Sequence, residues 1–70
     1  MDLNSAELGK EYVIKDVVVD GDEEMKSFLF SLGCYSGETI TVVDKKKNLV
    51  VSIKDARYNI DPALAAAIRI

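Results

Sequence analysis

One segment of the chain has a long helical pattern, and the stretches on both sides of it are short and rich in β-branched residues. In residues 20–33, "DGDEEMKSFLFSLG", Asp20 and Glu23 have the form of a capping box. Gly33 is placed to end the helix in the left-handed conformation. The apolar positions that share one face are Met25, Phe28, Leu29 and Leu32. The pattern predicts one helix that buries this face and leaves Phe30 outside it.

The flanking segments predict strands. Residues 12–19 are rich in β-branched residues, but Ile14 and Val17 can both face inward only if the chain bends near Lys15 and Asp16. Alternating apolar residues predict a hairpin from residues 38–44 and 49–53, joined at Lys45 to Asn48, a further strand at 56–60 and a last strand at 68–70.

Two short helical turns complete the expected order of elements. The first covers residues 4–9, with a cap at Asn4 or Ser5 and with Leu3 and Leu8 holding it to the body. The second begins at Pro62 after a cap at Asp61. Five short strands and one long helix favour closure, because a closed barrel has no exposed edges. We therefore expect a mainly β protein: a small SH3-like barrel of about five strands, with the helix inserted between the first and second strands.

The composition limits the function as well as the fold. At 70 residues, 49% hydrophobic and 30% charged, the chain predicts a single folded domain over residues 1–70. One cysteine cannot form an internal disulfide, and a lone thiol without a leader pattern favours the cytoplasm. The net charge of -3 argues against nucleic-acid binding, and no apolar run is long enough for membrane insertion.

The residues that could carry chemistry do not form a catalytic set. Cys34 has no histidine to act as its base, and it follows a helix C-terminus, so we expect it to pack rather than react. The acidic residues 20–24 suit helix capping better than metal binding. The lysines 45–47 suit a solvated turn, with an anionic membrane surface or an acidic partner as the alternative. We therefore expect no enzyme activity and no resident metal.

The corner after the helix is the candidate contact surface. Gly33 and Gly37 predict a structural elbow that ends the helix and turns the chain into the sheet. Phe30, Cys34 and Tyr35 would gather there as an exposed apolar patch, which most often marks a protein contact. The alternative is that the N-terminal turn covers Phe30.

These residues also give the chain a resemblance to a known family. The pattern consists of Leu8, Gly9, Ile14, Val17, Leu29, Leu32, Gly33, Gly37, Ile40, Val42, Ala65, Ile68 and Ile70. It resembles the FeoA family, small cytoplasmic proteins of bacterial ferrous iron transport, whose members are SH3-like barrels with an inserted helix. Ser36 stands where the family usually has proline, and Lys26 where arginine is common.

The resemblance implies a function in protein contact. The partner would be a FeoB-type membrane transporter, bound at its cytoplasmic G-domain, and Fe(II) is linked to the chain by the resemblance only. No catalytic residues carry over, and we place the contact surface on Lys26, Phe30, Cys34 and Tyr35. The alternative is a stand-alone module that responds to a transition metal, similar to the C-terminal domain of DtxR-type repressors. Self-association is left open.

Overall fold

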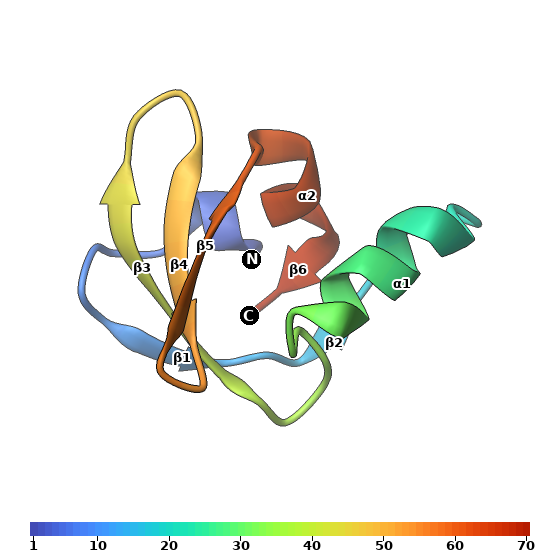
Figure 1. Cartoon of the computed structure of the whole chain (residues 1–70), viewed down its shortest axis with the longest axis horizontal. Helices are drawn as coiled ribbons and strands as arrows, with labels where there is room; N and C mark the ends of the chain where they lie inside the picture. The colour runs from blue at the N-terminus through green and yellow to red at the C-terminus, as the bar shows by residue number, and fades with distance from the viewer.

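The computed structural model describes residues 1–70 and arranges six strands in two antiparallel sheets (Figure 1). The larger sheet has the order β1-β3-β4-β5, and the smaller sheet pairs β2 with β6. The strands are β1 (Glu11–Val13), β2 (Asp16–Val17), β3 (Thr39–Lys45), β4 (Leu49–Ile53), β5 (Ala56–Ile60) and β6 (Ile68–Arg69). The other elements are η1 (Leu3–Ser5), α1 (Glu23–Ser31) and α2 (Pro62–Ala67).

The predicted strand at 12–19 is divided between the two sheets. The Ile14 N–H donates to the Glu38 carbonyl at 2.8 Å, on the side of the larger sheet. The next residue, Lys15, donates its N–H to the Arg69 carbonyl at 2.8 Å, on the side of the smaller sheet. Both Ile14 and Val17 are buried, which confirms the predicted bend between them.

The prediction of a closed barrel of about five strands is wrong, although the mainly β character with one long helix is confirmed. The sheets stay separate because β1 and β5 are opposite edges of the larger sheet and do not pair with each other. On the open side, α2 packs against η1 (Figure 1). Because the first predicted strand is really two strands, α1 follows β2 and does not lie between the first and second strands.

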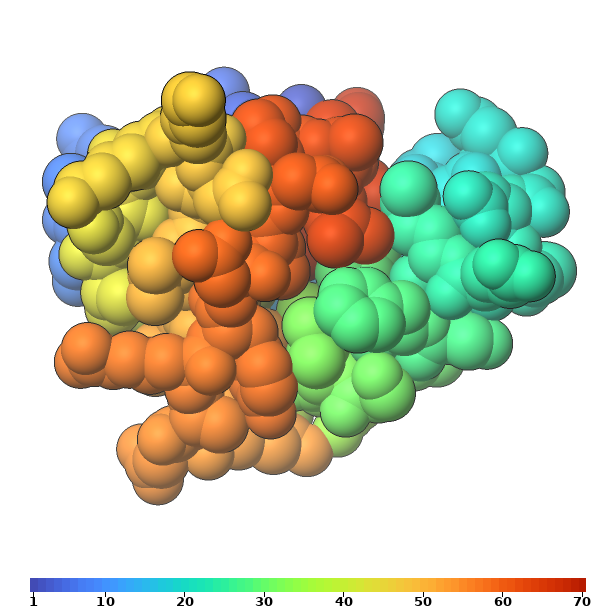
Figure 2. Space-filling model, turned by 45° about the horizontal axis from the view of Figure 1, so that its top comes forward, coloured from blue at the N-terminus to red at the C-terminus, as the bar shows by residue number.

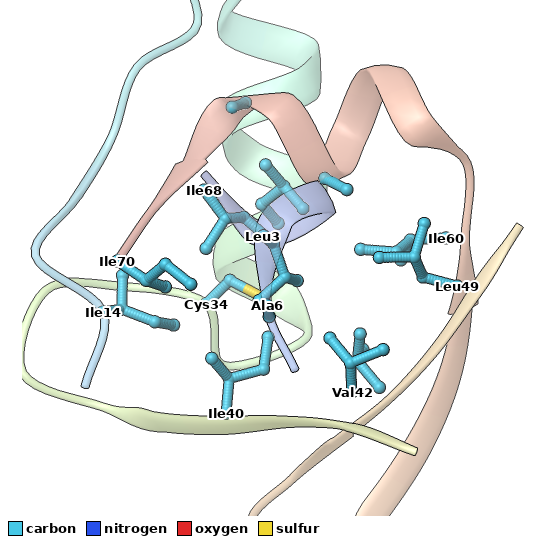
Figure 3. Close-up of a cluster of buried hydrophobic side chains, with 14 of the residues drawn as sticks. Leu3, Ala6, Ile14, Cys34, Ile40, Val42, Leu49, Ile60, Ile68 and Ile70 are labelled. Atoms are coloured by element: carbon cyan, nitrogen blue, oxygen red, sulfur yellow. The ribbon is translucent and has the colours of Figure 1, made fainter. Parts of the chain in front are cut away.

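The core lies between the larger sheet and the layer formed by η1, α2 and β6 (Figure 3). Strands β3 and β4 supply alternating inward residues, which confirms the predicted hairpin: Ile40, Val42, Leu49, Val51 and Ile53 are all buried. Leu3, Ile60, Ile68 and Ile70 close the cluster from the other elements. Each of these aliphatic side chains contributes about 1.5–3 kcal/mol relative to an exposed one, and no disulfide adds to this packing because the single cysteine is free.

Helix α1 begins later than the sequence pattern predicts. Asp20 and Gly21 have φ of +48° and +87°, a left-handed conformation that a right-handed helix cannot include. The cap is therefore Asp22, whose carboxylate accepts the Met25 N–H at 3.0 Å, and the predicted capping box of Asp20 and Glu23 does not form. The predicted end is confirmed, because Gly33 follows the helix with φ of +95°.

The predicted buried face of α1 is only partly correct. Leu29 is fully buried, Met25 and Leu32 are half-buried, and Phe28 is 47% exposed, so its predicted burial is wrong. The reason is the position of the helix, which stands at the side of the body (Figure 1). Of its apolar face, only the stripe with Met25, Leu29 and Leu32 packs against the core.

The two short helical turns follow the prediction in part. The cap of α2 at Asp61 and its start at Pro62 are confirmed. The N-terminal turn is capped by Asp2 instead of Asn4 or Ser5. Leu3 holds this turn to the core together with Ala6, whereas Leu8 is 58% exposed and cannot do so.

Candidate interaction surface

The elbow, the segment between α1 and β3, has its conformation fixed at two glycines, Gly33 and Gly37. Gly33 and Gly37 both have positive φ, +95° and +91°, a backbone conformation that residues other than glycine rarely adopt. A Cβ at Gly33 would lie 3.2 Å from the Ile53 side chain, so the elbow packs closely on β4. The Gly37 N–H donates to the Ile14 carbonyl at 2.8 Å, which ties the far end of the elbow to the crossing between the sheets.

Cys34 is part of the core and not part of the exposed patch. The Cys34 N–H donates to the Leu29 carbonyl at 2.9 Å, and the Gly33 N–H donates to the Phe30 carbonyl at 3.0 Å. This pair of bonds is a Schellman motif, which turns the residue after the glycine back over the helix. The Cys34 side chain is therefore fully buried beside Ile14 and Ile40 (Figure 3), and its predicted place on the contact surface is wrong. Burial raises the pKa of the Cys34 thiol to about 11.

Phe30 and Tyr35 do meet at the surface. Their ring centroids lie 6.2 Å apart at an interplanar angle of 83°, an edge-to-face arrangement that favours a fixed geometry. Phe30 is 45% exposed and Tyr35 is 36% exposed, so the N-terminal turn does not cover Phe30.

A lysine stands at each end of this aromatic pair. The Lys26 Nζ lies 5.6 Å from the centroid of the Phe30 ring, and the Lys54 Nζ lies 5.0 Å from that of Tyr35. Lys54 also donates a hydrogen bond to the Tyr35 hydroxyl and lies 3.4 Å from a carboxylate oxygen of Glu38. The hydrogen bond to Tyr35 and the electrostatic interaction with the same side chain raise the pKa of the Lys54 ammonium, and the nearby Glu38 carboxylate adds a smaller contribution in the same direction. We call Lys26, Phe30, Tyr35 and Lys54 the aromatic patch.

Lys54 is the member of this patch that the sequence did not predict. It lies in the turn between β4 and β5, where Lys54 and Asp55 both have positive φ. The sequence predicts a turn there, but only the packing of Gly33 on the end of β4 brings that turn beside the elbow.

The opposite side of α1 borders a small apolar groove. Phe28 and Phe30 are two positions apart, a rotation of about 200° around the helix, so their side chains point about 160° apart, on nearly opposite sides of α1. The groove has a volume of about 260 Å³ and lies between α2 and the start of α1, where Figure 2 shows a hollow between the red and cyan segments. Its lining residues are Val18, Val19, Asp20, Met25, Ala63, Ala66 and Ala67.

No three side chains of histidine, cysteine, aspartate or glutamate lie close enough together to hold a metal ion. Neither α-helix has the length and apolar character needed to cross a bilayer.

The whole chain, residues 1–70, matches the family model described as the FeoA domain. The chain belongs to the FeoA family. This membership confirms the resemblance seen in the sequence. Among curated proteins, none matches the sequence.

Solved structures of similar fold include two FeoA proteins. One is FeoA of Stenotrophomonas maltophilia in complex with zinc, described as a prokaryotic SH3 domain protein. It has a TM-score of 0.87 and 22% identity, over 97% of this chain and 86% of that one. The other is an iron uptake regulatory protein, FeoA, with a TM-score of 0.83 and 23% identity over 94% of this chain and 86% of that one.

A third similar structure is a manganese-dependent transcriptional repressor. It has a TM-score of 0.85 and 20% identity, and the match covers 97% of this chain but only 39% of the repressor. These likenesses show that the chain has the SH3-like fold, in the open form described above.

Proposed function

We propose that this chain is an accessory protein of ferrous iron transport. It acts in the cytoplasm, without catalysis, by binding the G-domain of a FeoB-type membrane transporter through the aromatic patch. Membership of the FeoA family supports the link to iron transport. The Stenotrophomonas maltophilia relative is itself described as a candidate activating factor of ferrous iron transport.

The observation that carries this proposal is the construction of the aromatic patch. Two half-exposed rings meet edge to face, and each ring has a lysine ammonium beside it. Aromatic residues dominate the binding energy of protein interfaces when a partner removes them from water. The flanking ammonium groups favour a partner that offers carboxylates around an apolar side chain.

Calorimetric titration of the chain with the transporter's G-domain tests the proposal. Phe30→Ala and Tyr35→Ala should each weaken binding by about 5- to 30-fold, the range expected for central aromatic residues. Phe28→Ala is the matched control, because Phe28 is on the same helix and has a similar exposure of 47%. Phe28 points away from the patch, so the affinity of the Phe28→Ala variant for the G-domain should stay within about twofold of that of the unmodified chain.

Each result has a definite meaning. Loss of binding in Phe28→Ala, with Phe30→Ala unchanged, would move the contact to the groove side of α1 and refute the aromatic patch. Absence of binding by the unmodified chain would refute the contact with the G-domain altogether.

The metal-responsive alternative stays a prediction, because the likeness to the manganese-dependent repressor concerns the fold alone. Titration with Fe(II) and Mn(II) tests it directly. Stoichiometric, tight binding to the isolated chain would favour a metal sensor over a contact protein.

A further inference from the structure

The three lysines of the β3–β4 hairpin have different surroundings, and a β-bulge just before them sets the direction of the first, Lys45. Val42 pairs with Val51, but Asp44 pairs with Val50, so Val43 is the extra residue. After a bulge, the following residues point to the opposite face from the one that simple alternation predicts. The Lys45 side chain consequently reaches η1, where its Nζ donates to the carbonyls of Asn4 at 2.8 Å and Ala6 at 2.6 Å.

The other two lysines border an open polar depression on the outer face of the larger sheet. Its floor is a row of residues that oppose one another across three strands, Asp44, Val50 and Asn59. The depression has a volume of about 510 Å³. We call it the hairpin dish; it is lined by Asp44, Lys46, Lys47, Asn48, Val50 and Asn59.

The dish and the aromatic patch are separate sites. Asn48 directly precedes β4 and Lys54 directly follows it, so the two sites lie at opposite ends of this strand. The hairpin turn also stands away from α1 in both views (Figures 1 and 2).

Most polar groups of the dish are free to bind a ligand. The side chains of Lys46, Lys47, Asn48 and Asn59 make no hydrogen bond or ion pair within the chain. Only the Asp44 carboxylate is engaged, since one of its oxygens accepts the Lys45 N–H at 2.9 Å. Two ammonium groups against one carboxylate make the dish locally positive, although the whole chain has a net charge of -3.

We propose that the hairpin dish binds a phosphate group. Lysine and asparagine side chains that line one depression can offer ammonium and amide N–H groups to the several acceptor oxygens of phosphate. Lysines alone would be enough to keep the hairpin turn in contact with water. A depression that two asparagine side chains also line is not needed for that purpose. The phosphate belongs either to a soluble small molecule or to an anionic lipid headgroup.

Amide chemical shifts of the ¹⁵N-labelled chain, titrated with inorganic phosphate and with pyrophosphate, test for the soluble source. Flotation with phosphatidylcholine vesicles, with and without phosphatidylglycerol, tests for the headgroup. Shifts confined to residues 44–50 and 59 would assign a soluble phosphate compound. Binding only to the vesicles that contain phosphatidylglycerol would assign the headgroup.

Three variants make the test specific. Lys46→Ala with Lys47→Ala should weaken binding by about twentyfold, as expected for two ammonium groups near a phosphate in water. Lys10→Ala with Lys15→Ala removes the same charge elsewhere and should change affinity by less than about twofold. Asp44→Asn keeps the oxygen that accepts the Lys45 N–H and removes the repulsion, so it should strengthen binding by about fivefold.

If the Lys10 and Lys15 double variant weakens binding as much as the Lys46 and Lys47 double variant does, the ligand is attracted by the overall charge of the chain, and the proposal is overturned. Absence of both the local shifts and the vesicle binding would overturn it as well. None of these variants touches Lys45, and the amide spectra of the free proteins report directly whether each variant is folded.

Discussion

Replacing Cys34 by alanine should remove a specific part of the pH dependence of stability. The thiol is fully buried, and burial raises its pKa to about 11 in the folded chain. In the unfolded chain the thiol is in water, where its pKa is about 8.5. The unfolded state therefore releases a proton at a pH where the folded state still keeps it.

The sign and size of the effect follow from these two values. The contribution of the thiol to stability is fully present below about pH 8.5 and is lost as the pH rises toward 11. At about pH 10 the loss amounts to about 2 kcal/mol. Cys34→Ala cannot show this loss, because alanine has no proton to release.

Urea denaturation of the unmodified chain and of Cys34→Ala, each at pH 7 and pH 10, measures the difference. Other groups titrate in both proteins and cancel in the comparison, as does the constant cost of the smaller side chain. If the free energy of unfolding falls by the same amount in both proteins between pH 7 and pH 10, within about 0.5 kcal/mol, the thiol is not buried in the core as described. Fast alkylation of the native protein by iodoacetamide would contradict it in the same way, since a pKa near 11 lowers the thiolate fraction at pH 8 by about two hundredfold.

Three further substitutions test the local structure by urea denaturation. Gly33→Ala should destabilise the fold more than Gly37→Ala. Both positions have positive φ, so an alanine at either one is strained by about 1–2 kcal/mol, but only a Cβ at Gly33 meets a neighbour, at 3.2 Å. Equal losses of stability in the two variants would argue against the close packing of Gly33 on β4. Asp22→Ala should cost about 1 kcal/mol as a lost helix cap, whereas Asp20→Ala should cost less, and the reverse order would place the start of α1 at Asp20. Lys45→Met should cost about 1–2 kcal/mol, because two carbonyls of the N-terminal turn lose their donor; a change below about 0.5 kcal/mol would mean that Lys45 is as free as an ordinary surface lysine.

The elements whose signals are local could be predicted from the sequence. The alternation in β3 and β4, the cap and proline of α2 and the glycine that ends α1 each depend on a few neighbouring residues, and each is confirmed. The predicted start of α1 at Asp20 is wrong, because residue type alone makes Asp20 as acceptable a cap as Asp22. The left-handed conformation of Asp20 becomes visible only in the structure.

The predictions that failed depended on distant parts of the chain. Phe28 has the spacing of a buried residue, but the body of the protein contacts only the stripe of α1 that carries Met25, Leu29 and Leu32, and this stripe is too narrow to cover Phe28. The number of strands favours a closed barrel, but closure depends on whether β1 and β5 reach each other, and they do not pair.

The candidate site was predicted in the same partial way. Phe30 and Tyr35 are exposed and in contact, as their positions around the elbow suggested. Cys34 lies between them in the sequence, yet the Schellman motif turns it inward. Lys54 joins the patch from 19 residues away, a contact that no local pattern could indicate.

Helix α1 anchors itself to the rest of the molecule through one fully buried side chain, Leu29, and it is bounded by left-handed residues at both ends. Its exposed positions, unlike the half-buried Met25, are thus not needed for packing against the core. Substitutions there can alter which macromolecule is recognised without a matching change in the interior, so related proteins can diverge in their associations while keeping the same scaffold.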